Sequence, residues 1–460
     1  MLRDLLASLV RRAWRATGAT RPDGRAPQAP GTLRELFESL LWSERYEQAR
    51  ALAQDALARD PASYEAHLLV GRAHQKLHRP ERALEYFKAA RHMRPDDAEL
   101  HDFLGSLYQE LGRLPEAFAE FDRALALRPD FALAAFHRAM ARLLAGDFER
   151  GWDDYELRRL NAAPVPGAAG VPRWDGSALA GRTILVSREQ GLGDEIMFAS
   201  ILPQLMTLAG HCVVECDPRL LATFRRSFPA ATIAASMPGG GVAPDAAPRP
   251  IDVAIESGSL PRVFRRRAAD FPRHGGYLRA DPVQVDRWRG RLAALGPGLK
   301  VGLSWTGGVP MTRRALRSIP LDQLLPVLRV QGVRFVSLQY TADARDDANA
   351  LHARHGIRVE HWPEAIVDYQ QSAALVCALD LVVSVCTSIV HLGGALGRPV
   401  WVLAPVSPEW RYGFKGDSMA WYPSVRIFRQ SEYGVWTPVI AAVAHELAAR
   451  TGERSGGPAP

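Results

Sequence analysis

The sequence predicts two fold classes in one chain: an array of α-helical repeats, followed by an α/β region built on parallel sheets. A period of 34 residues runs through the first third of the chain. Through the remaining two thirds, short β-branched segments alternate with helical patterns. Because parallel α/β sheets bind their ligands at the carboxyl ends of the strands, we expect the chemistry to reside in the second part.

The repeats align most clearly between residues 64–97 and residues 98–131. Equivalent positions hold the same residue in the pairs Gly71 and Gly105, Ala83 and Ala117, Phe87 and Phe121, and Pro95 and Pro129. Small residues at fixed positions let two antiparallel helices pack closely, and a proline after the second helix ends it. This pattern is that of tetratricopeptide (TPR) repeats, and it predicts about four helix pairs within residues 31–165, the last of them degenerate.

The first helix of each TPR pair is expected to line the concave side of the array. The residues expected there include Tyr64, His67, His101 and Gln109. Since TPR grooves bind peptides and proteins, the array predicts a protein partner.

Residues 1–30 precede the repeats. Residues 1–17 place leucines, a valine and a tryptophan at helical spacing among arginines. An amphipathic helix of this kind suits either a cap on the repeat array or peripheral contact with a membrane surface. The proline- and glycine-rich residues 20–30 predict a linker.

The α/β region is expected to contain two halves, residues 172–289 and residues 299–450. Strands are predicted at residues 183–187, 211–216, 251–255, 300–304, 333–338, 356–360, 380–385 and 400–403. Helical patterns separate most of these segments, and such alternation is typical of parallel sheets covered by helices. A final helical pattern covers residues 435–449.

The first strand of this region leads into a glycine-rich turn. Residues 190–198 read QGLGDEIMF and begin a helical pattern. Gly191 and Gly193 let the backbone turn tightly and approach a ligand closely. The turn is not the dinucleotide-binding fingerprint, because no third glycine follows at the required spacing.

A second motif begins where the apolar segment 379–385 ends. Cys386, Thr387 and Ser388 follow, and a helical pattern covers residues 389–396. Unpaired backbone N–H groups and the helix dipole favour an anion at such a helix start, so this is a candidate phosphate site. The alternative is an ordinary strand–helix–strand unit capped by Thr387.

Together these motifs resemble those of the heptosyltransferase-like glycosyltransferases, and their place after a repeat array resembles the bacterial class that fuses TPR repeats to such a domain. The matching segments are WDGS (174–177), QGLGDEIMFASILPQL (190–205), VGLSWTGG (301–308), RSIPL (317–321), FVSLQ (335–339) and SVCTSIVHLGGALGRPVWVL (384–403). The resemblance covers roughly residues 172–430. It implies a GT-B fold, in which two Rossmann-like lobes face each other across a cleft and a terminal helix often packs back on the first lobe.

The resemblance also implies an inverting sugar transfer that needs neither a metal nor a cofactor. Asp194 then takes the role of the base, and Arg317 stabilises the departing diphosphate. The alternative role for Asp194 is to cap the following helix. The other residues assigned to donor binding are Gly193, Ser304, Trp305, Thr306, Gln339, Cys386, Thr387, Ser388 and His391. Trp410 and Arg411 are expected on a loop that reaches the cleft.

Three of these assignments have a competing structural explanation. Trp305 and His391 both lie among apolar residues, so each also suits a core position. Cys386 stands where the family usually has an aspartate that helps to place the donor sugar or ribose. A buried cysteine at a strand end is usually a small apolar filler, so its presence leaves the donor identity and the activity open.

Composition excludes several other functions. The formal net charge of +7 comes mainly from arginine, and no aromatic–basic motif accompanies it, so nucleic-acid binding is not expected. No window of the sequence contains 18 uninterrupted apolar residues, so a membrane span is not expected. The cysteines form neither zinc-type pairs nor a disulfide framework, which favours a reducing cytoplasm. No carboxylate pair is placed to hold a metal–nucleotide, so no metal is expected.

The sequence therefore predicts a cytoplasmic glycosyltransferase that moves a sugar from a nucleotide-sugar donor to an acceptor recruited by the TPR array. A protein acceptor is expected, and the resemblance suggests flagellin. Two alternatives stay open. One is a transferase for surface polysaccharide or lipopolysaccharide, and the other is a non-catalytic TPR scaffold with a decayed transferase domain.

Overall fold

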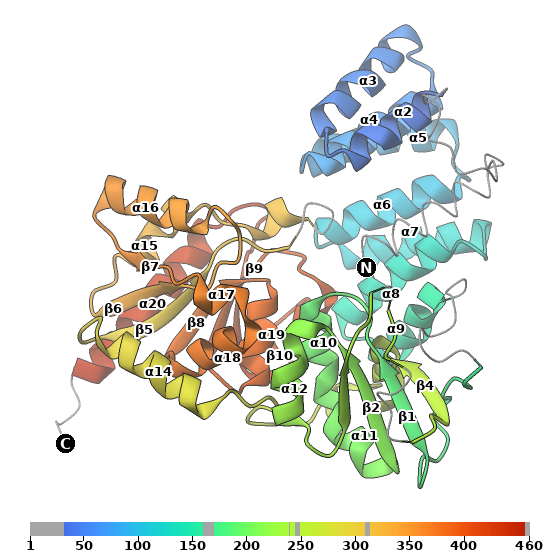
Figure 1. Cartoon of the computed structure of the whole chain (residues 1–460). Coiled ribbons are helices and arrows are strands. Elements are labelled where there is room, and N and C mark those ends of the chain that lie inside the picture. Colours follow the sequence, from blue (N-terminus) through green and yellow to red (C-terminus); the bar gives the residue numbers. More distant parts are fainter. Residues whose placement is uncertain (1–31, 160–169, 239, 244–248, 309–312, 456–460) are drawn as a thin grey trace. The chain divides into compact units, whose positions relative to one another are not determined.

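The structure is a computed structural model that describes residues 32–159, 170–238, 240–243, 249–308 and 313–455 (Figure 1). The expected amphipathic helix and linker of residues 1–30 lie outside the described residues. The chain divides into two compact units. One consists mainly of the repeats and the other of the α/β region, and each is described by itself.

The repeat unit consists of antiparallel helix pairs, as the 34-residue period predicts. Its helices are α2 (Leu33–Trp42), α3 (Tyr46–Arg59), α4 (Tyr64–Lys76), α5 (Pro80–Met93), α6 (Ala98–Glu110), α7 (Leu114–Leu127) and α8 (Ala132–Ala145). The boundary between the two units falls within α9 (Phe148–Tyr155), the second helix of the last pair. Thr32, Ser63 and Asp97 cap the first helices of three pairs by accepting backbone N–H bonds. The four expected pairs are present, and the eight residues of α9 make the last pair short.

Two glycines explain why the second and third pairs repeat so faithfully. A Cβ atom on Gly71 would lie 2.5 Å from the ring of Phe87, and one on Gly105 would lie 2.6 Å from the ring of Phe121. Each phenylalanine therefore fills the space that its glycine leaves empty. The period places Phe37 and Ala53 at the same positions in the first pair, where both are fully buried in one cluster. The large and small residues have exchanged helices there.

The expected concave surface is partly wrong. Tyr64 and His101 are buried, with 7% and 6% of their surfaces exposed. The Tyr64 ring lies beneath the Arg94 guanidinium, at 4.4 Å. His101 Nε2 contacts the Pro95 carbonyl at 2.8 Å. Both side chains lie at the start of a first helix and do not face outward. Tyr64 packs beneath a residue that follows α5, whereas His101 packs against the turn before α6.

The α/β unit begins with a four-stranded parallel sheet. Its strands are β1 (Thr183–Ser187), β2 (His211–Cys216), β3 (Thr232–Ala235) and β4 (Val253–Glu256), in the order β3-β2-β1-β4. The helices of this part are α10 (Leu192–Phe198), α11 (Leu202–Leu208), α12 (Leu221–Ser227) and α13 (Pro261–Phe264). The motif segment before β1 adds to the edge at β4, where Trp174 donates its backbone N–H to Ala254 at 2.9 Å. Strand β3 was not predicted, because its four residues include two alanines.

The second sheet has seven strands. They are β5 (Leu299–Ser304), β6 (Val333–Ser337), β7 (Val359–Glu360), β8 (Leu381–Val385), β9 (Val400–Ala404), β10 (Ser418–Met419) and β11 (Tyr422–Arg429). The order is β10-β11-β9-β8-β5-β6-β7, and all neighbours are parallel except β10 with β11. Strands β10 and β11 were not predicted, because β10 has two residues and β11 contains a proline and two arginines.

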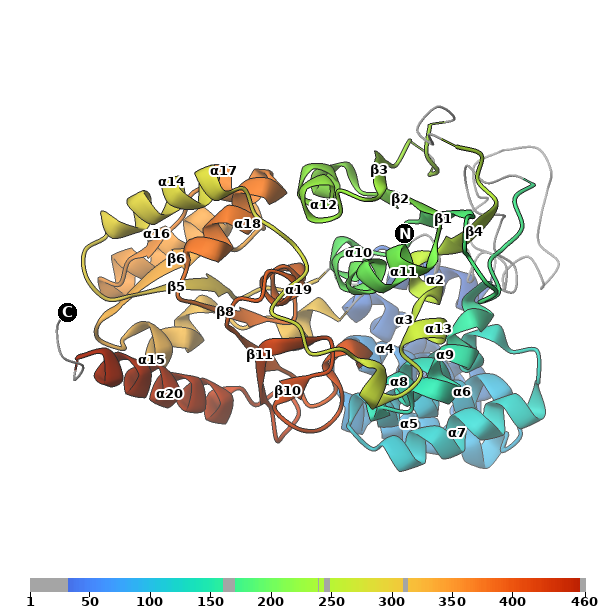
Figure 2. The same cartoon turned by 90° about the horizontal axis from the view of Figure 1, so that it is seen from below.

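Helices cover both faces of the second sheet, with α14 and α18 on one side and α15 and α20 on the other (Figure 2). The remaining bounds are α14 (Pro282–Ala293), α15 (Leu325–Leu328), α16 (Ala344–His355), α17 (Glu364–Val367), α18 (Tyr369–Ala378), α19 (Ser388–Ala395) and α20 (Thr437–Ser455). Val443 and Leu447 of α20 belong to the core of the second sheet, together with Leu299. The expectation that this helix packs on the first half is therefore wrong, because its apolar face is buried on the second sheet.

In the part of the chain that the structure describes, no helix is both long enough and apolar enough to cross a membrane. The four cysteines are free thiols, and three of them are buried.

Candidate functional site

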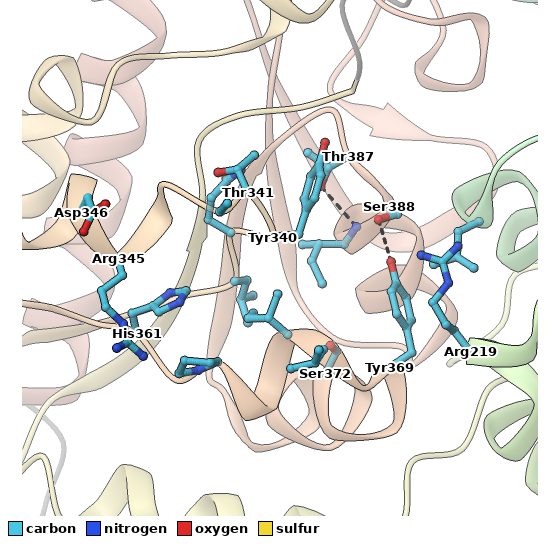
Figure 3. Close-up of a pocket in the computed structure, with 18 residues that line it drawn as sticks. Arg219, Tyr340, Thr341, Arg345, Asp346, His361, Tyr369, Ser372, Thr387 and Ser388 are labelled. Carbon is cyan, nitrogen blue, oxygen red and sulfur yellow. Dashed lines mark hydrogen bonds between the residues drawn. The ribbon is translucent and has the colours of Figure 1, made fainter. Parts of the chain in front are cut away.

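The α/β unit contains a cavity of about 660 Å³ (Figure 3). Its polar lining consists of Arg219, Gln339, Tyr340, Thr341, Arg345, Asp346, His361, Tyr369, Ser372, Thr387 and Ser388. Leucine, isoleucine, valine and proline side chains supply the apolar lining. A cavity of this size, lined by both polar and apolar side chains, has the dimensions of a small-molecule site.

The cavity lies at the carboxyl ends of parallel strands. Residues 338–346 follow β6, His361 follows β7, and Thr387 and Ser388 follow β8. Leu192 and Arg219 come from the first sheet, where they follow β1 and β2. This is the edge at which open α/β sheets bind ligands.

The start of α19 forms one wall of the cavity. Thr387 is the N-cap, and its Oγ1 accepts the backbone N–H of Ile389 at 3.2 Å. The Ser388 hydroxyl contacts the Tyr369 hydroxyl at 2.7 Å. Burial raises the pKa of Tyr369 to about 12, so the phenol is neutral at pH 7 and can donate a hydrogen bond.

His361, Arg345 and Asp346 lie together at the far end of the cavity from Tyr369 and Ser388 (Figure 3). Burial lowers the pKa of His361, so its imidazole is neutral at pH 7. Its Nδ1 contacts the Ser337 hydroxyl at 3.1 Å. This end therefore offers a neutral ring and a carboxylate on the same wall.

Gln339 lines the cavity, but its amide is occupied by the protein. Its Oε1 accepts the Ser304 hydroxyl at 3.1 Å and the backbone N–H groups of Trp305 and Thr306 at 3.0 Å each. Its Nε2 donates to the Thr306 carbonyl at 3.2 Å. The side chain clamps the end of β5 to the end of β6, and a contact with the donor would require these bonds to be exchanged.

Trp305 belongs to the core of the second sheet, with 2% of its surface exposed. Its indole N–H donates to Asp347 at 3.1 Å. The indole N–H therefore has a partner within the protein. The explanation of Trp305 as a core residue is confirmed.

Beside the cavity lies a second group of charged side chains, which we call the ionic cluster: Asp194, Arg317, Glu409 and Arg411. Asp194 forms an ion pair with Arg411, and Arg317 forms one with Glu409. No more than 16% of any of these side chains is exposed. The Arg317 guanidinium also donates to the Cys386 carbonyl at 3.4 Å. The cluster joins the start of α10 to the loop that carries Trp410, which is itself buried.

Asp194 lies in the first turn of α10, whose N-cap is Gly191, so it is not the N-cap that the alternative explanation predicts. Its Oδ2 accepts the backbone N–H of Gly191 at 3.3 Å, while its Oδ1 pairs with Arg411. Gly193, one residue earlier, allows α10 and α19 to approach. A Cβ atom there would lie 3.0 Å from the ring of His391 and 3.4 Å from the Cα of Ser388.

His391 and Cys386 are both buried close to the ionic cluster. Burial, together with the charges of Arg411 and Arg317, lowers the pKa of His391 well below its usual value, so the ring is neutral. Its Nδ1 contacts the Tyr422 hydroxyl at 3.2 Å. Burial likewise raises the pKa of Cys386, so its thiol is protonated. Neither group is charged at pH 7.

The structure thus divides the predicted site residues into two groups. Gln339, Thr387 and Ser388 line the cavity. The others lie in the ionic cluster, in the core, in the contact between α10 and α19, or at the end of β5, where Gln339 holds Thr306. Sequence reasoning missed the cavity residues Arg219, Tyr340, Thr341, Arg345, Asp346, His361, Tyr369 and Ser372. Most of them could have been found by applying the carboxyl-end rule to every predicted strand as well as to those with a recognised motif.

Among the described residues, no group of three or more histidine, cysteine, aspartate or glutamate side chains is arranged to hold a metal ion. The absence of a metal from the reaction stays a prediction.

The architecture is therefore that of a TPR array followed by an α/β region with two parallel sheets. One family model of the tetratricopeptide repeat matches residues 40–107, and a second matches residues 104–159. The repeat prediction is confirmed by these matches and by the helix pairs.

A curated relative also covers part of the chain. The chain is 36% identical over 333 residues to Protein FlbA of Caulobacter vibrioides. The match covers 69% of this chain and 55% of FlbA, so the chain spans about half the length of that relative.

Solved structures similar to the chain include MamA, the thermophilic TPR protein TTC0263 of Thermus thermophilus, and PilW. MamA is 21% identical and covers 27% of this chain and 74% of its own, with a TM-score of 0.25. TTC0263 is 25% identical over 35% of this chain and 84% of its own, with a TM-score of 0.28. PilW is 27% identical over 29% of this chain and 63% of its own, with a TM-score of 0.26.

Proposed function

We propose that the chain is a metal-independent glycosyltransferase with two Rossmann-like lobes in a GT-B arrangement. The observation that carries the proposal is the cavity, because the two motif segments meet there. Leu192 belongs to the glycine-rich turn, whereas Thr387 and Ser388 belong to the second motif. These segments lie almost two hundred residues apart, and both contribute to one small-molecule site at the carboxyl ends of parallel strands.

Sugar transfer with inversion requires a base, a group that stabilises the departing diphosphate, and a pocket that orients the donor. In this proposal, Asp194 removes the proton from the acceptor hydroxyl. Its Oδ1 is held by Arg411, and its Oδ2 contacts only the backbone N–H of Gly191. The oxygen at Oδ2 is therefore the one offered to an acceptor, while Arg411 orients the carboxylate.

The acceptor is proposed to be a protein that binds to the TPR array in the cytoplasm. Flagellin is the acceptor suggested by the resemblance to TPR–transferase fusions. A surface polysaccharide or lipopolysaccharide acceptor would instead have to bind to the α/β unit alone.

The second candidate function is a non-catalytic scaffold, and the ionic cluster favours it. The expected base, Asp194, is paired with Arg411, and the expected diphosphate cation, Arg317, is paired with Glu409. Cys386 also occupies the position where the family usually has a carboxylate. A protein that had lost its activity could retain such a cluster for packing alone.

A panel of nucleotide sugars separates the two functions. A bound donor raises the melting temperature by mass action, so at least one nucleotide sugar should stabilise the full chain. Transfer from that donor should fall by a factor of about one hundred or more in Asp194→Asn, while donor binding is retained. Near-normal transfer by this variant would remove Asp194 from the mechanism. Failure of every donor to bind would favour the scaffold.

A further inference from the structure

Arg219 is a cation that the first sheet contributes to the cavity. It follows β2, and it lies at the end of the cavity where Tyr369 and Ser388 meet (Figure 3). Its side chain is 57% exposed, so a ligand can reach it. The other arginine in the lining, Arg345, lies at the opposite end. Arg317 and Arg411 do not line the cavity, because each is paired within the ionic cluster.

Asp217 fixes the orientation of Arg219. The Arg219 Nε donates to Asp217 Oδ1 at 2.9 Å, and its Nη2 donates to Oδ2 at 2.9 Å. A guanidinium has five N–H donors in a planar fork, and this bidentate contact uses two of them. Three donors are left for a ligand, on a group whose direction is already set.

Asp217 is itself held by contacts with Glu195 and Arg188. Its backbone N–H donates to Glu195 at 2.8 Å, and Arg188 contacts its Oδ2 at 3.3 Å. Arg188 also donates to Glu195 at 2.8 Å. Arg188 is therefore shared between Asp217 and Glu195, and its side chain is mostly buried. Arg219 pairs with Asp217 and supplies the accessible positive charge at this end of the cavity.

Two hydroxyls complete this end of the cavity. The Tyr369 and Ser388 hydroxyls contact each other at 2.7 Å, and one of their two hydrogens makes that bond. The other hydrogen can be donated to a ligand. A guanidinium with three open donors beside a hydroxyl donor matches an oxyanion with several acceptor oxygens, such as a phosphate or diphosphate.

We propose that Arg219, held by Asp217, binds the diphosphate of the cavity's ligand together with the hydroxyls of Tyr369 and Ser388. This inference rests on the proposed function, because it takes the ligand to be a nucleoside diphosphate compound. Arg219 then has the diphosphate-binding role that the resemblance assigns to Arg317. The nucleoside extends toward His361, where the Asp346 carboxylate can accept hydrogen bonds from ribose hydroxyls. Asp217 acts as a positioning residue.

The test is a titration of the full chain with inorganic pyrophosphate at low salt, compared among variants. Arg219→Gln should weaken pyrophosphate binding about tenfold or more, since it removes a charged hydrogen-bonding partner. The matched control is Arg345→Gln, which removes the same charge from the opposite end and should change the affinity less than about twofold. Equal weakening in both variants, or no pyrophosphate binding by the unsubstituted protein, would overturn the inference.

Two further variants separate binding from folding. Arg219→Lys keeps the charge but loses the planar fork, so it should retain part of the affinity. Asp217→Asn should weaken pyrophosphate binding less than Arg219→Gln does. The double variant with both substitutions should bind pyrophosphate as weakly as Arg219→Gln alone. Independent, additive losses would show that Asp217 does not act through Arg219. Melting temperatures measured in parallel identify any variant that has lost its fold.

The inference and the proposed function fail in different ways. If pyrophosphate binding depends on Arg219 but no nucleotide sugar is turned over, Arg219 retains its role and the glycosyltransferase proposal fails. If a sugar is transferred but neither pyrophosphate nor donor affinity responds to Arg219→Gln, the proposed function stands and the role of Arg219 is wrong.

Discussion

The cavity and the ionic cluster both border the start of α19, but their charged side chains differ in exposure and in pairing. In the ionic cluster, Asp194 and Arg411 are mostly buried and are paired with each other. In the cavity, Arg219 is 57% exposed and keeps open donors although Asp217 holds it. Ion pairs of the first kind hold elements together, whereas a cation of the second kind is available to a ligand.

This difference shows why the presence of a motif does not locate a binding group. Arg317 and Asp194 fall in the segments that most resemble a glycosyltransferase, yet both face other side chains of the same protein. Arg219 lies outside every matching segment, and it reaches the cavity because β2 ends at the same edge as the motif-bearing strands. The matching residues shape the walls, and an unmatched residue supplies the accessible charge.

Among the changes that test this difference, the largest expected effect is on the free energy of unfolding. Arg411→Met should lower the free energy of unfolding by about 3–5 kcal/mol, because it leaves the Asp194 carboxylate buried without its partner. Arg219→Met should change it by less than about 0.5 kcal/mol, because an exposed ion pair contributes little. Urea unfolding of the two variants measures both values. Similar losses in the two variants would show that the cluster and the cavity end are not different in kind.

A pH dependence should come from Glu195, which supports Asp217. Burial raises the pKa of Glu195 to about 7, even though Arg188 and the Asp217 backbone favour its ionised form. Between its usual pKa near 4.5 and pH 7, the folded state therefore holds a proton that the unfolded state has lost. Stability should fall as the pH rises through this window, by up to about 3 kcal/mol from this group.

The variant Glu195→Gln tests this assignment. It should remove the fall in stability between pH 4.5 and pH 7, because the amide does not titrate. The neighbouring groups that carry charge or titrate include Arg188, Asp217, Arg219 and Cys216. Burial raises the pKa of Cys216 to about 12, so its thiol does not titrate in this window. An unchanged slope in the variant would assign the pH dependence to another group.

The smallest effect is expected at Cys386. Cys386→Ala should leave donor binding and transfer within about twofold of the unsubstituted protein, because the thiol is a protonated, fully buried filler. Iodoacetamide should modify Cys377 first, since that residue is partly exposed, and should reach Cys386 only on unfolding. A loss of more than tenfold in Cys386→Ser, with the fold preserved, would give the sulfur a specific role.

Periodicity in the sequence predicted most of the fold. The 34-residue period predicted the four helix pairs, and β-branched runs predicted eight of the eleven strands that the described residues form. The missed strands lack that signal, as in β11, where Pro423 and Arg426 interrupt the apolar pattern. The packing of α20 was mispredicted, because an amphipathic pattern reveals an apolar face but not the sheet that covers it.

The site was less predictable than the fold. Thr387 and Ser388 were identified because a strand end followed by hydroxyl residues is a local signal. The pairing of Arg317 with Glu409 joins residues 92 positions apart, and that of Asp194 with Arg411 joins residues 217 positions apart. Sequence analysis could name these groups as charged, but only the fold shows that they neutralise one another.

The exchanged residues in the first TPR pair limit how the array can be recombined. Whole repeats can be duplicated or deleted, because each carries its own large and small partners. Single helices cannot be interchanged with the same freedom. Joining α2 to α5 would set Phe37 against Phe87, two rings in a space that holds one, whereas joining α4 to α3 would set Gly71 against Ala53 and leave a void. The unit of this array that can be duplicated or deleted without a packing defect is thus the helix pair.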